Sequence, residues 1–222
     1  MDTAFLTETE LFAGIRPDEM DRLLVCLSAT RRQYKKGDTI FSADTRLTEI
    51  GLVLTGSVHV IINYFWGDAN IFGHVEEGEI FGEAYAALHK ETLTEVVAAE
   101  DAEILFLNMH KILTTCEQSC AFHHRLIYNI VGISARKNLA LSARMVHIAP
   151  KSIRDRVFAY LSQQALEASD REFSIPFSRQ ELADYLGVNR SALSAELSRM
   201  QKDGKIAFHK NRFRLLEGPA PY

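Results

Sequence analysis

The chain has 222 residues, 47% of them apolar, which suits one large or two modest domains with packed cores and argues against disorder. No apolar run approaches the roughly 18 residues of a membrane span. The start of the chain has neither the basic nor the apolar stretch of a signal peptide, so we expect a cytoplasmic protein without membrane association. Residues 1–149 hold 13 Lys and Arg against 20 Asp and Glu, whereas residues 150–222 hold 12 against 9, so only the C-terminal part suits a polyanionic partner.

Residues 5–29 are expected to form a short helical segment in which Pro17 opens a helix and Asp18 and Glu19 favour its positive end. From about Arg32 to Met109 the sequence changes to short β-rich runs punctuated by glycines, such as 50–60 and 96–107. This spacing predicts an antiparallel barrel or jelly roll. Nothing in residues 32–109 indicates a catalytic site, so we expect this part of the chain to act as a sensor.

After Met109 the apolar period becomes helical, and the run from Ser119 to Ile148 predicts one long helix. A 3.5-residue seam follows one side of it: Ile127, Val131, Ser134, Asn138, Leu141, Met145 and Ile148. The simplest partner for this seam is the same helix of a second subunit, with Asn138 fixing the register. A second stripe, Leu126, Ile130 and Ile133, favours packing on the chain's own barrel, and the two arrangements are compatible.

The residues after Ala149-Pro150, where that helix should end, have the pattern of a winged helix-turn-helix. Ser152 opens one helix, and Ser178 to Met200 then form two short helices joined by a turn at Gly187. A capping box from Ser178 to Glu181 starts the first of the two, and Asn189 caps the second. Residues 205–208 and 213–216 alternate like two strands around a basic wing tip, His209-Lys210-Asn211-Arg212, placed to touch phosphate.

The second short helix of such a motif lies in the major groove of DNA, with its N-terminal residues and those one turn later, here Arg190, Ser191, Ser194 and Ala195, facing the bases. Arg190 can pair with guanine through two hydrogen bonds, whereas Ser191 and Ser194 discriminate less sharply. The candidate DNA-binding residues are Ser178, Arg179, Asn189, Arg190, Ser191, Ser194, Arg199, Lys210 and Arg212. Four of these, Ser178, Arg179, Lys210 and Arg212, are assigned to the phosphate backbone, and a solvated surface position is their alternative interpretation. Glu196 has no evident role beyond an ion pair with Arg199.

The motifs occur in a recognisable order: KGDTIF at 36–41, GLVLTGSVHV at 51–60, EEGEIFGE at 76–83, AAEDAEILFLN at 98–108 and the helix-turn-helix at 178–200. In this order the chain resembles the cyclic-AMP receptor protein / FNR (CRP/FNR) family of bacterial transcription regulators. The resemblance implies an α+β fold with three parts. These are a cyclic-nucleotide-binding-like β-roll (double-stranded β-helix or jelly roll) at 1–118, a dimerisation helix at 119–148 and the winged helix-turn-helix at 149–222.

The same resemblance implies a homodimer that binds a pseudo-palindromic double-stranded DNA operator, is controlled by a small-molecule effector or redox signal in the β-roll, and works with RNA polymerase. Well-studied members carry a glutamate and an arginine at the positions of Ser191 and Ala195, so the operator should differ from the sites those members bind. The resemblance points to Gly82, Glu83 and Asn138 as effector-binding residues.

Cyclic AMP is not the expected effector. In relatives that bind it, an arginine about ten residues after the ribose-binding glutamate holds the cyclic phosphate, and that position falls here on Leu93. A phosphate would lose its charge-assisted bond there and would meet Glu91 and Glu95. Lys90 replaces the arginine only if the loop shifts.

Two metal cofactors, an iron–sulphur cluster and haem, are considered as alternatives to a nucleotide effector. An iron–sulphur cluster is not expected, because the N-terminal cysteine cluster of the family's oxygen sensors is absent. Haem, as in a gas sensor, is an alternative because four histidines lie in or near the sensor: His74, His89, His123 and His124. Their spacing does not single out a ligand set.

The pocket could instead be apolar and take a small aromatic or acidic metabolite among Trp66, Phe72, Tyr85 and Phe122, although core packing explains these aromatics equally well. A constitutive DNA-binding regulator with a vestigial pocket and a β-roll enzyme with a histidine-bound metal are the rival classes.

The three cysteines, Cys26, Cys116 and Cys120, are an odd number without a paired framework. Reduced structural thiols are therefore the first expectation. Cys116 and Cys120 stand four residues apart, but two ligands rarely make a metal site, and the sequence leaves open whether this pair senses redox state.

Overall fold

A computed structural model of the chain describes residues 3–63, 69–114 and 121–216. The contacts between residues divide the chain into two compact units, Met1–Arg136 and Lys137–Tyr222, which are described one after the other. Trp66, Cys116, Ser119 and Cys120 lie outside the described residues, as does the side chain of Phe72. Within the described ranges, no helix is both long and apolar enough to cross a membrane.

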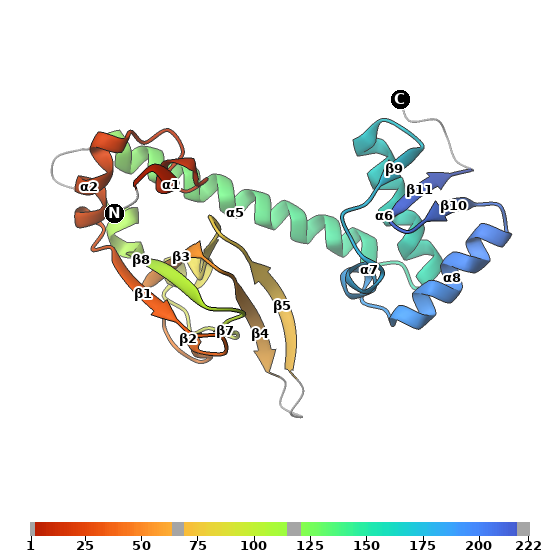
Figure 1. Cartoon of the computed structure of the whole chain (residues 1–222), viewed down its shortest axis with the longest axis horizontal. Helices are drawn as coiled ribbons and strands as arrows, with labels where there is room; N and C mark the ends of the chain where they lie inside the picture. The colour runs from red at the N-terminus through yellow and green to blue at the C-terminus, as the bar shows by residue number, and fades with distance from the viewer. Residues whose placement is uncertain (1–2, 64–68, 115–120, 217–222) are drawn as a thin grey trace. The chain divides into compact units, whose positions relative to one another are not determined.

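The first unit is built on two four-stranded antiparallel sheets (Figure 1). The strands β1 (Thr30–Tyr34), β8 (Ala102–Asn108), β3 (Glu49–Thr55) and β6 (Ile80–Phe81) form one sheet in that order. The other sheet has the order β2 (Thr39–Phe41), β7 (Glu95–Ala98), β4 (Val58–Asn63) and β5 (Ala69–Val75). Four short helices accompany them: α1 (Thr3–Glu8), α2 (Pro17–Cys26), α3 (Glu83–Leu88) and α4 (Met109–Leu113). The predicted β-roll is confirmed, and Pro17 does open α2.

The core of the first unit forms around the two central strands β3 and β8. In β3 every side chain from Ile50 to Leu54 is buried, and in β8 the same holds from Ile104 to Leu107. Strands with both faces covered require apolar residues at successive positions instead of every second one. Gly51 interrupts the run because a Cβ at this position would overlap the ring of Phe81 on the neighbouring strand β6.

A single helix of 28 residues, α5 (Ala121–Ile148), begins in the first unit and ends in the second. Leu126, Ile130 and Ile133 are at most 6% exposed and belong to the β-roll core, so this stripe packs on the chain's own first domain, as one of the two interpretations predicted. Asn129 adds two hydrogen bonds of 2.9 Å to the carbonyl groups of Leu11 and Ala13.

His123, in the first turn of α5, is buried without full hydrogen bonding. Its side chain is 1% exposed, and its Nδ1 has no hydrogen-bond partner among the described residues. An unpaired buried polar atom costs about 1–3 kcal/mol. Burial, together with the neighbouring His124, holds the pKa of His123 below its ordinary value, so the ring is neutral near pH 7.

The second unit contains the winged helix-turn-helix that the sequence predicts. It consists of α6 (Ile153–Ala168), β9 (Glu172–Ser174), α7 (Arg179–Leu186), α8 (Arg190–Lys202), β10 (Ile206–His209) and β11 (Arg212–Leu215), with the strands in the order β10-β11-β9 (Figure 1). Ser152 caps α6 through the backbone N–H of Asp155. The apolar positions of the three helices share one core with Phe173, Ile206 and Phe213 of the sheet.

Two arginines from different helices hold the C-terminal end of α7. Arg144 of α5 donates hydrogen bonds of 2.9 Å to the carbonyl groups of Asp184 and Tyr185. Arg156 of α6 donates bonds of 3.0 and 3.3 Å to those of Leu186 and Gly187. The last carbonyl groups of a helix lack partners within the helix and carry partial negative charge, so guanidinium groups suit this position. These two side chains and the four carbonyl groups are called the arginine clamp below.

His147, one turn after Arg144, extends the clamp into the core. Its Nδ1 lies 2.9 Å from the hydroxyl oxygen of Tyr185, and its Nε2 lies 2.7 Å from Oε1 of Gln163 on α6. These contacts place the last turns of α5 in the second unit. The contacts therefore divide the chain between Arg136 and Lys137, upstream of Ala149-Pro150. The predicted ranges 1–118, 119–148 and 149–222 stay a proposal about how the chain is organised.

Replacing Arg144 tests the clamp. The Arg144→Gln variant should lower the free energy of unfolding of the second unit by about 1.5–3 kcal/mol, because bonds from a charged donor to two helix carbonyls are lost. Hydrogen exchange of the α7 amides should report the change. Lys151→Gln, which alters an exposed side chain, is the control. Equal protection of α7 in both variants would show that the clamp does not hold the helix.

Candidate DNA-binding interface and sensor site

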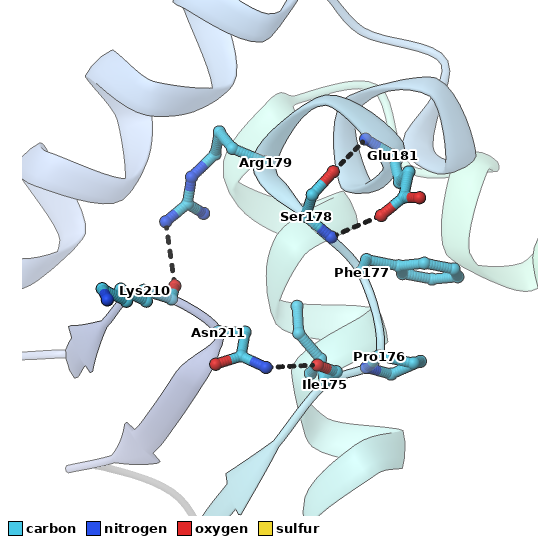
Figure 2. Close-up of a pocket in the computed structure, with 8 residues that line it drawn as sticks. All are labelled: Ile175, Pro176, Phe177, Ser178, Arg179, Glu181, Lys210 and Asn211. Atoms are coloured by element: carbon cyan, nitrogen blue, oxygen red, sulfur yellow. Dashed lines mark hydrogen bonds between the residues drawn. The ribbon is translucent and has the colours of Figure 1, made fainter.

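The N-terminus of α7 is fixed by the predicted capping box. The Ser178 hydroxyl accepts a bond of 3.3 Å from the backbone N–H of Glu181, and the Ser178 N–H donates one of 2.6 Å to the Glu181 carboxylate (Figure 2). The backbone N–H of Ser178, and then its hydroxyl, hold the pKa of Glu181 below its ordinary value. Ser178 stays exposed at the helix end, where backbone N–H groups and the dipole favour an anion.

Arg179 joins α7 to the wing. Its Nη2 donates a bond of 3.3 Å to the carbonyl of Lys210 (Figure 2). Its guanidinium also lies 5.1 Å from the ring centroid of Phe208. Burial lowers the pKa of Arg179. Asn211 holds the wing from the other side by donating a bond of 3.2 Å to the carbonyl of Ile175. An open hollow of ≈ 590 Å³ lies between the capping box and the wing turn.

The recognition helix α8 turns an exposed polar edge away from the core. Leu193, Leu197 and Met200 are fully buried on one side. On the other side Arg190 and Ser191 are exposed, and Ser194, one turn later, is half-buried. Asn189 Oδ1 accepts bonds from both the N–H and the hydroxyl of Ser191, at 2.8 and 2.6 Å, so the predicted cap is confirmed and also orients the Ser191 hydroxyl.

Glu196 has a role that the sequence did not reveal in full. The predicted ion pair with Arg199 is confirmed at 3.1 Å, but the Glu196 carboxylate also binds Arg154 of α6 at 2.7 Å. Arg154 in turn binds Asp203 beyond the end of α8. Glu196 is only 12% exposed, and its pair with Arg154 was not predicted from the sequence because the two residues lie 42 positions apart. Arg199 is 69% exposed, so its guanidinium is available at the surface.

The predicted four-residue wing tip is wrong by one residue on each side. His209 and Arg212 pair with each other at the ends of β10 and β11, so the turn consists of Lys210 and Asn211 alone. Phe208 and Phe213 form the neighbouring pair of the ladder, and their rings stack with the centroids 5.6 Å apart. Lys210 takes a positive φ of 55° and is exposed. Arg212 is exposed as well and pairs with Glu172 at 3.2 Å.

Among the predicted effector residues, only Gly82 and Glu83 lie in the same compact unit. Gly82 has φ +81°, and a Cβ there would press on Phe41 and Leu47, so glycine suits the position for two reasons. Glu83 follows as the first residue of α3 and is 8% exposed. Asn138 is exposed on the part of α5 that belongs to the second unit.

The loop after α3 carries an apolar side chain at the position where the resemblance described above implies a phosphate-binding arginine. Leu93 is 75% exposed. The loop is tied to the segment before β3, because the Thr92 hydroxyl donates to the Ser42 carbonyl at 2.9 Å and Glu91 pairs with Arg46 at 3.2 Å. These ties oppose the shift that would let Lys90 replace the arginine.

The histidines proposed as haem or metal ligands are dispersed. His74 lies beside His59 with ring centroids 5.1 Å apart, His89 ends α3 with a left-handed backbone, His124 is exposed and His123 is buried. In the three described ranges, no group of three or more His, Cys, Asp or Glu residues is placed to hold a metal ion. Tyr85 and Phe122 pack against the β-roll core.

Comparisons with known proteins agree with this architecture. The family model of the cyclic nucleotide-binding domain matches residues 31–119, and that of the Crp-like helix-turn-helix domain matches residues 155–220. The chain is 26% identical to the cyclic AMP receptor protein of Thermus thermophilus over 88% of this chain and 87% of the relative. It is 24% identical to the transcriptional regulatory protein btr of Bordetella pertussis over 93% and 85%.

Solved structures show the same fold at low identity. The c-di-GMP responsive global regulator CLP of Xanthomonas campestris superposes with a TM-score of 0.58 at 19% identity, covering 91% of this chain and all of that one. CprK complexed with OCPA superposes with a TM-score of 0.64 at 13% identity, covering 88% and 89%. With both domains matched in the order that the structure shows, the chain belongs to the CRP/FNR family of DNA-binding transcription regulators.

Proposed function

We propose that this regulator acts as a homodimer on a pseudo-palindromic operator, and that it answers a small-molecule or redox signal in the β-roll that is not cyclic AMP. The observation that carries the proposal is the exposed edge of α8, which a buried apolar face and the Glu196–Arg154 ion pair hold in a fixed orientation. RNA polymerase is the further partner that such a regulator would need at its promoters.

The base contacts are assigned to the N-terminal part of α8. Arg190 is exposed at the first position of the helix, from which its guanidinium can give two hydrogen bonds to a guanine in the major groove. Ser191 and Ser194 follow on the same edge, and Asn189 and Arg199 flank it. Since Ser191 already donates its hydroxyl to Asn189, it offers the DNA an acceptor, which makes its readout dependent on the cap.

The phosphate contacts are assigned to the surface beside α8. Ser178 and Lys210 line the hollow in Figure 2 together with Arg179, whose guanidinium holds the wing turn. Arg212 extends the basic surface along the wing. Contacts of this kind fix the register of the protein on DNA without reading its sequence.

Dimerisation is assigned to the exposed side of α5. Val131, Leu141 and Met145 of the predicted seam are 60%, 50% and 66% exposed. Leu139 and Val146 are exposed to a similar extent but lie about a third of a turn round the helix from the seam. An exposed apolar strip such as this seam is best covered by its own copy around a two-fold axis. The paired recognition helices would then lie about 34 Å apart, one turn of DNA.

Regulation is assigned to a shift between two populations of the dimer. A signal that binds one arrangement of the β-roll more tightly than another would change the fraction of dimers whose two α8 helices match the operator spacing. Leu93 at the phosphate position, together with the tied loop, is the reason to exclude cyclic AMP as that signal.

Base readout by Arg190 is tested with DNA from the regulator's own promoter region. Arg190→Ala should weaken operator binding by about 1–3 kcal/mol, roughly 5-fold to 150-fold, while light scattering shows an intact dimer. Lys202→Ala removes one positive charge from the other end of the same helix and should have a much smaller effect. Unchanged operator affinity of Arg190→Ala would remove this residue from the readout.

Dimerisation is tested by placing a charge in the strip. Leu141→Glu should convert the dimer to a monomer in light scattering, because the two-fold axis brings two carboxylates together in an apolar contact. Leu166→Glu, at a 61% exposed apolar position on α6, is the matched control and should stay dimeric. A monomeric wild-type protein, or a dimeric Leu141→Glu variant, would contradict the assignment.

The exclusion of cyclic AMP is tested by thermal unfolding. A ligand present at a hundred times its dissociation constant stabilises the folded state by about 2.7 kcal/mol, which raises the melting temperature by several degrees. We expect about 1 mM cyclic AMP to leave the melting temperature unchanged. A concentration-dependent rise would show that the missing arginine is not required.

A further inference from the structure

A cysteine and a histidine outside the proposed DNA and effector sites face each other in the first unit. Cys26 is the last residue of α2, and His123 lies in the first turn of α5. The Sγ atom of Cys26 lies 3.7 Å from Nε2 of His123. Cys26 is partly exposed, whereas His123 is 1% exposed, so the pair has one side open to solvent and the other inside the core.

The histidine is not explained by packing. A neutral imidazole carries one donor and one acceptor, and with Nε2 directed at Cys26 the Nδ1 atom has no partner among the described residues. Leu126, three residues further along α5, fills the same core with carbon alone and leaves nothing unpaired. The ring is therefore held with Nε2 towards the thiol even though this orientation leaves Nδ1 unpaired, and a buried group with such a cost calls for a chemical explanation.

The surroundings favour a base that accepts a proton over a preformed thiolate. Cys26 is the last residue of α2, so its thiol does not lie at a helix N-terminus, which is one of the positions where preformed thiolates occur. Burial, and then the charge of His124, hold the pKa of His123 below its ordinary value, so its ring is neutral near pH 7 and keeps one nitrogen as an acceptor. A thiol beside a neutral imidazole is the arrangement by which an adjacent base activates a nucleophile.

We propose that Cys26 and His123 form a peroxide-reactive thiol site in which His123 accepts the thiol proton. Sγ attacks one oxygen of hydrogen peroxide, and the new S–O bond forms as the O–O bond breaks. The proton passes from sulphur to Nε2 and then to the departing hydroxide, which leaves as water. The thiol is oxidised to sulphenic acid and the peroxide is reduced, which is the first and reversible step of cysteine oxidation. This site does not depend on the function proposed above.

The experiment uses the full chain with Cys116→Ser and Cys120→Ser, so that Cys26 is the only thiol. Hydrogen peroxide is added at neutral pH, sulphenic acid is trapped with dimedone, and the second-order rate constant is measured by mass spectrometry. The folded protein should react at least about tenfold faster than the same protein unfolded in denaturant, because a positioned base contributes a hundredfold or more at its best.

His123→Gln keeps a polar side chain of similar size but removes the base, and it should lower the rate at least about tenfold. His74→Gln, which changes an exposed histidine on β5 that does not contact the pair, should leave the rate unchanged. At about pH 10, where an ordinary thiol is already ionised, the parent and His123→Gln should react equally fast.

Three results would overturn the proposal. One is a folded protein that reacts no faster than the unfolded one, a comparison that needs no histidine variant. Another is an unchanged rate in His123→Gln. The third is a rate difference that persists at about pH 10, because it would come from altered exposure of Cys26 instead of proton transfer.

Discussion

The DNA-binding half of this protein depends on how the end of α7 is held. Two guanidinium groups bind the four successive carbonyl groups from Asp184 to Gly187 at the C-terminal end of that helix. Because Arg144 comes from α5 and Arg156 from α6, the clamp fixes α7 relative to both. The turn at Gly187 and α8 follow directly, so the orientation of the recognition helix depends on the clamp as well as on its own buried face.

Much of the basic charge in the C-terminal part serves the fold. Arg154 binds Glu196 and Asp203, Arg156 binds carbonyl groups, and Arg179 holds the wing. The excess of positive charge over residues 150–222 therefore overstates the charge that faces a DNA duplex. What remains at the surface, above all Arg190, Lys210 and Arg212, lies on α8 and at the wing, where a winged helix-turn-helix contacts its target.

Local features were predictable from the sequence, and distant ones were not. The caps at Ser152, Ser178 and Asn189 and the turn at Gly187 depend on residues within four positions, and each is confirmed. The arginine clamp joins residues 30 to 41 positions apart, and no spacing rule connects them. The wing tip is a local exception: the alternating pattern on either side predicts two strands but does not determine how close to the turn their pairing continues, and His209 and Arg212 belong to the ladder. For the sensor, the sequence identified the substitution at Leu93, but not the bonds from Thr92 and Glu91 that keep its loop in place.

Because α5 continues across the two compact units, it determines where the sensor of one regulator can be joined to the DNA-binding domain of another. Pro150 is the obvious seam in the sequence, yet a splice there would separate Arg144 and His147 from the α7 and α6 groups that they bind. A new sensor attached at that proline would have to bring its own arginine and histidine in the right helical phase. Crossover points in chimaeric regulators, natural or engineered, are therefore better sought inside the long helix, upstream of Lys137.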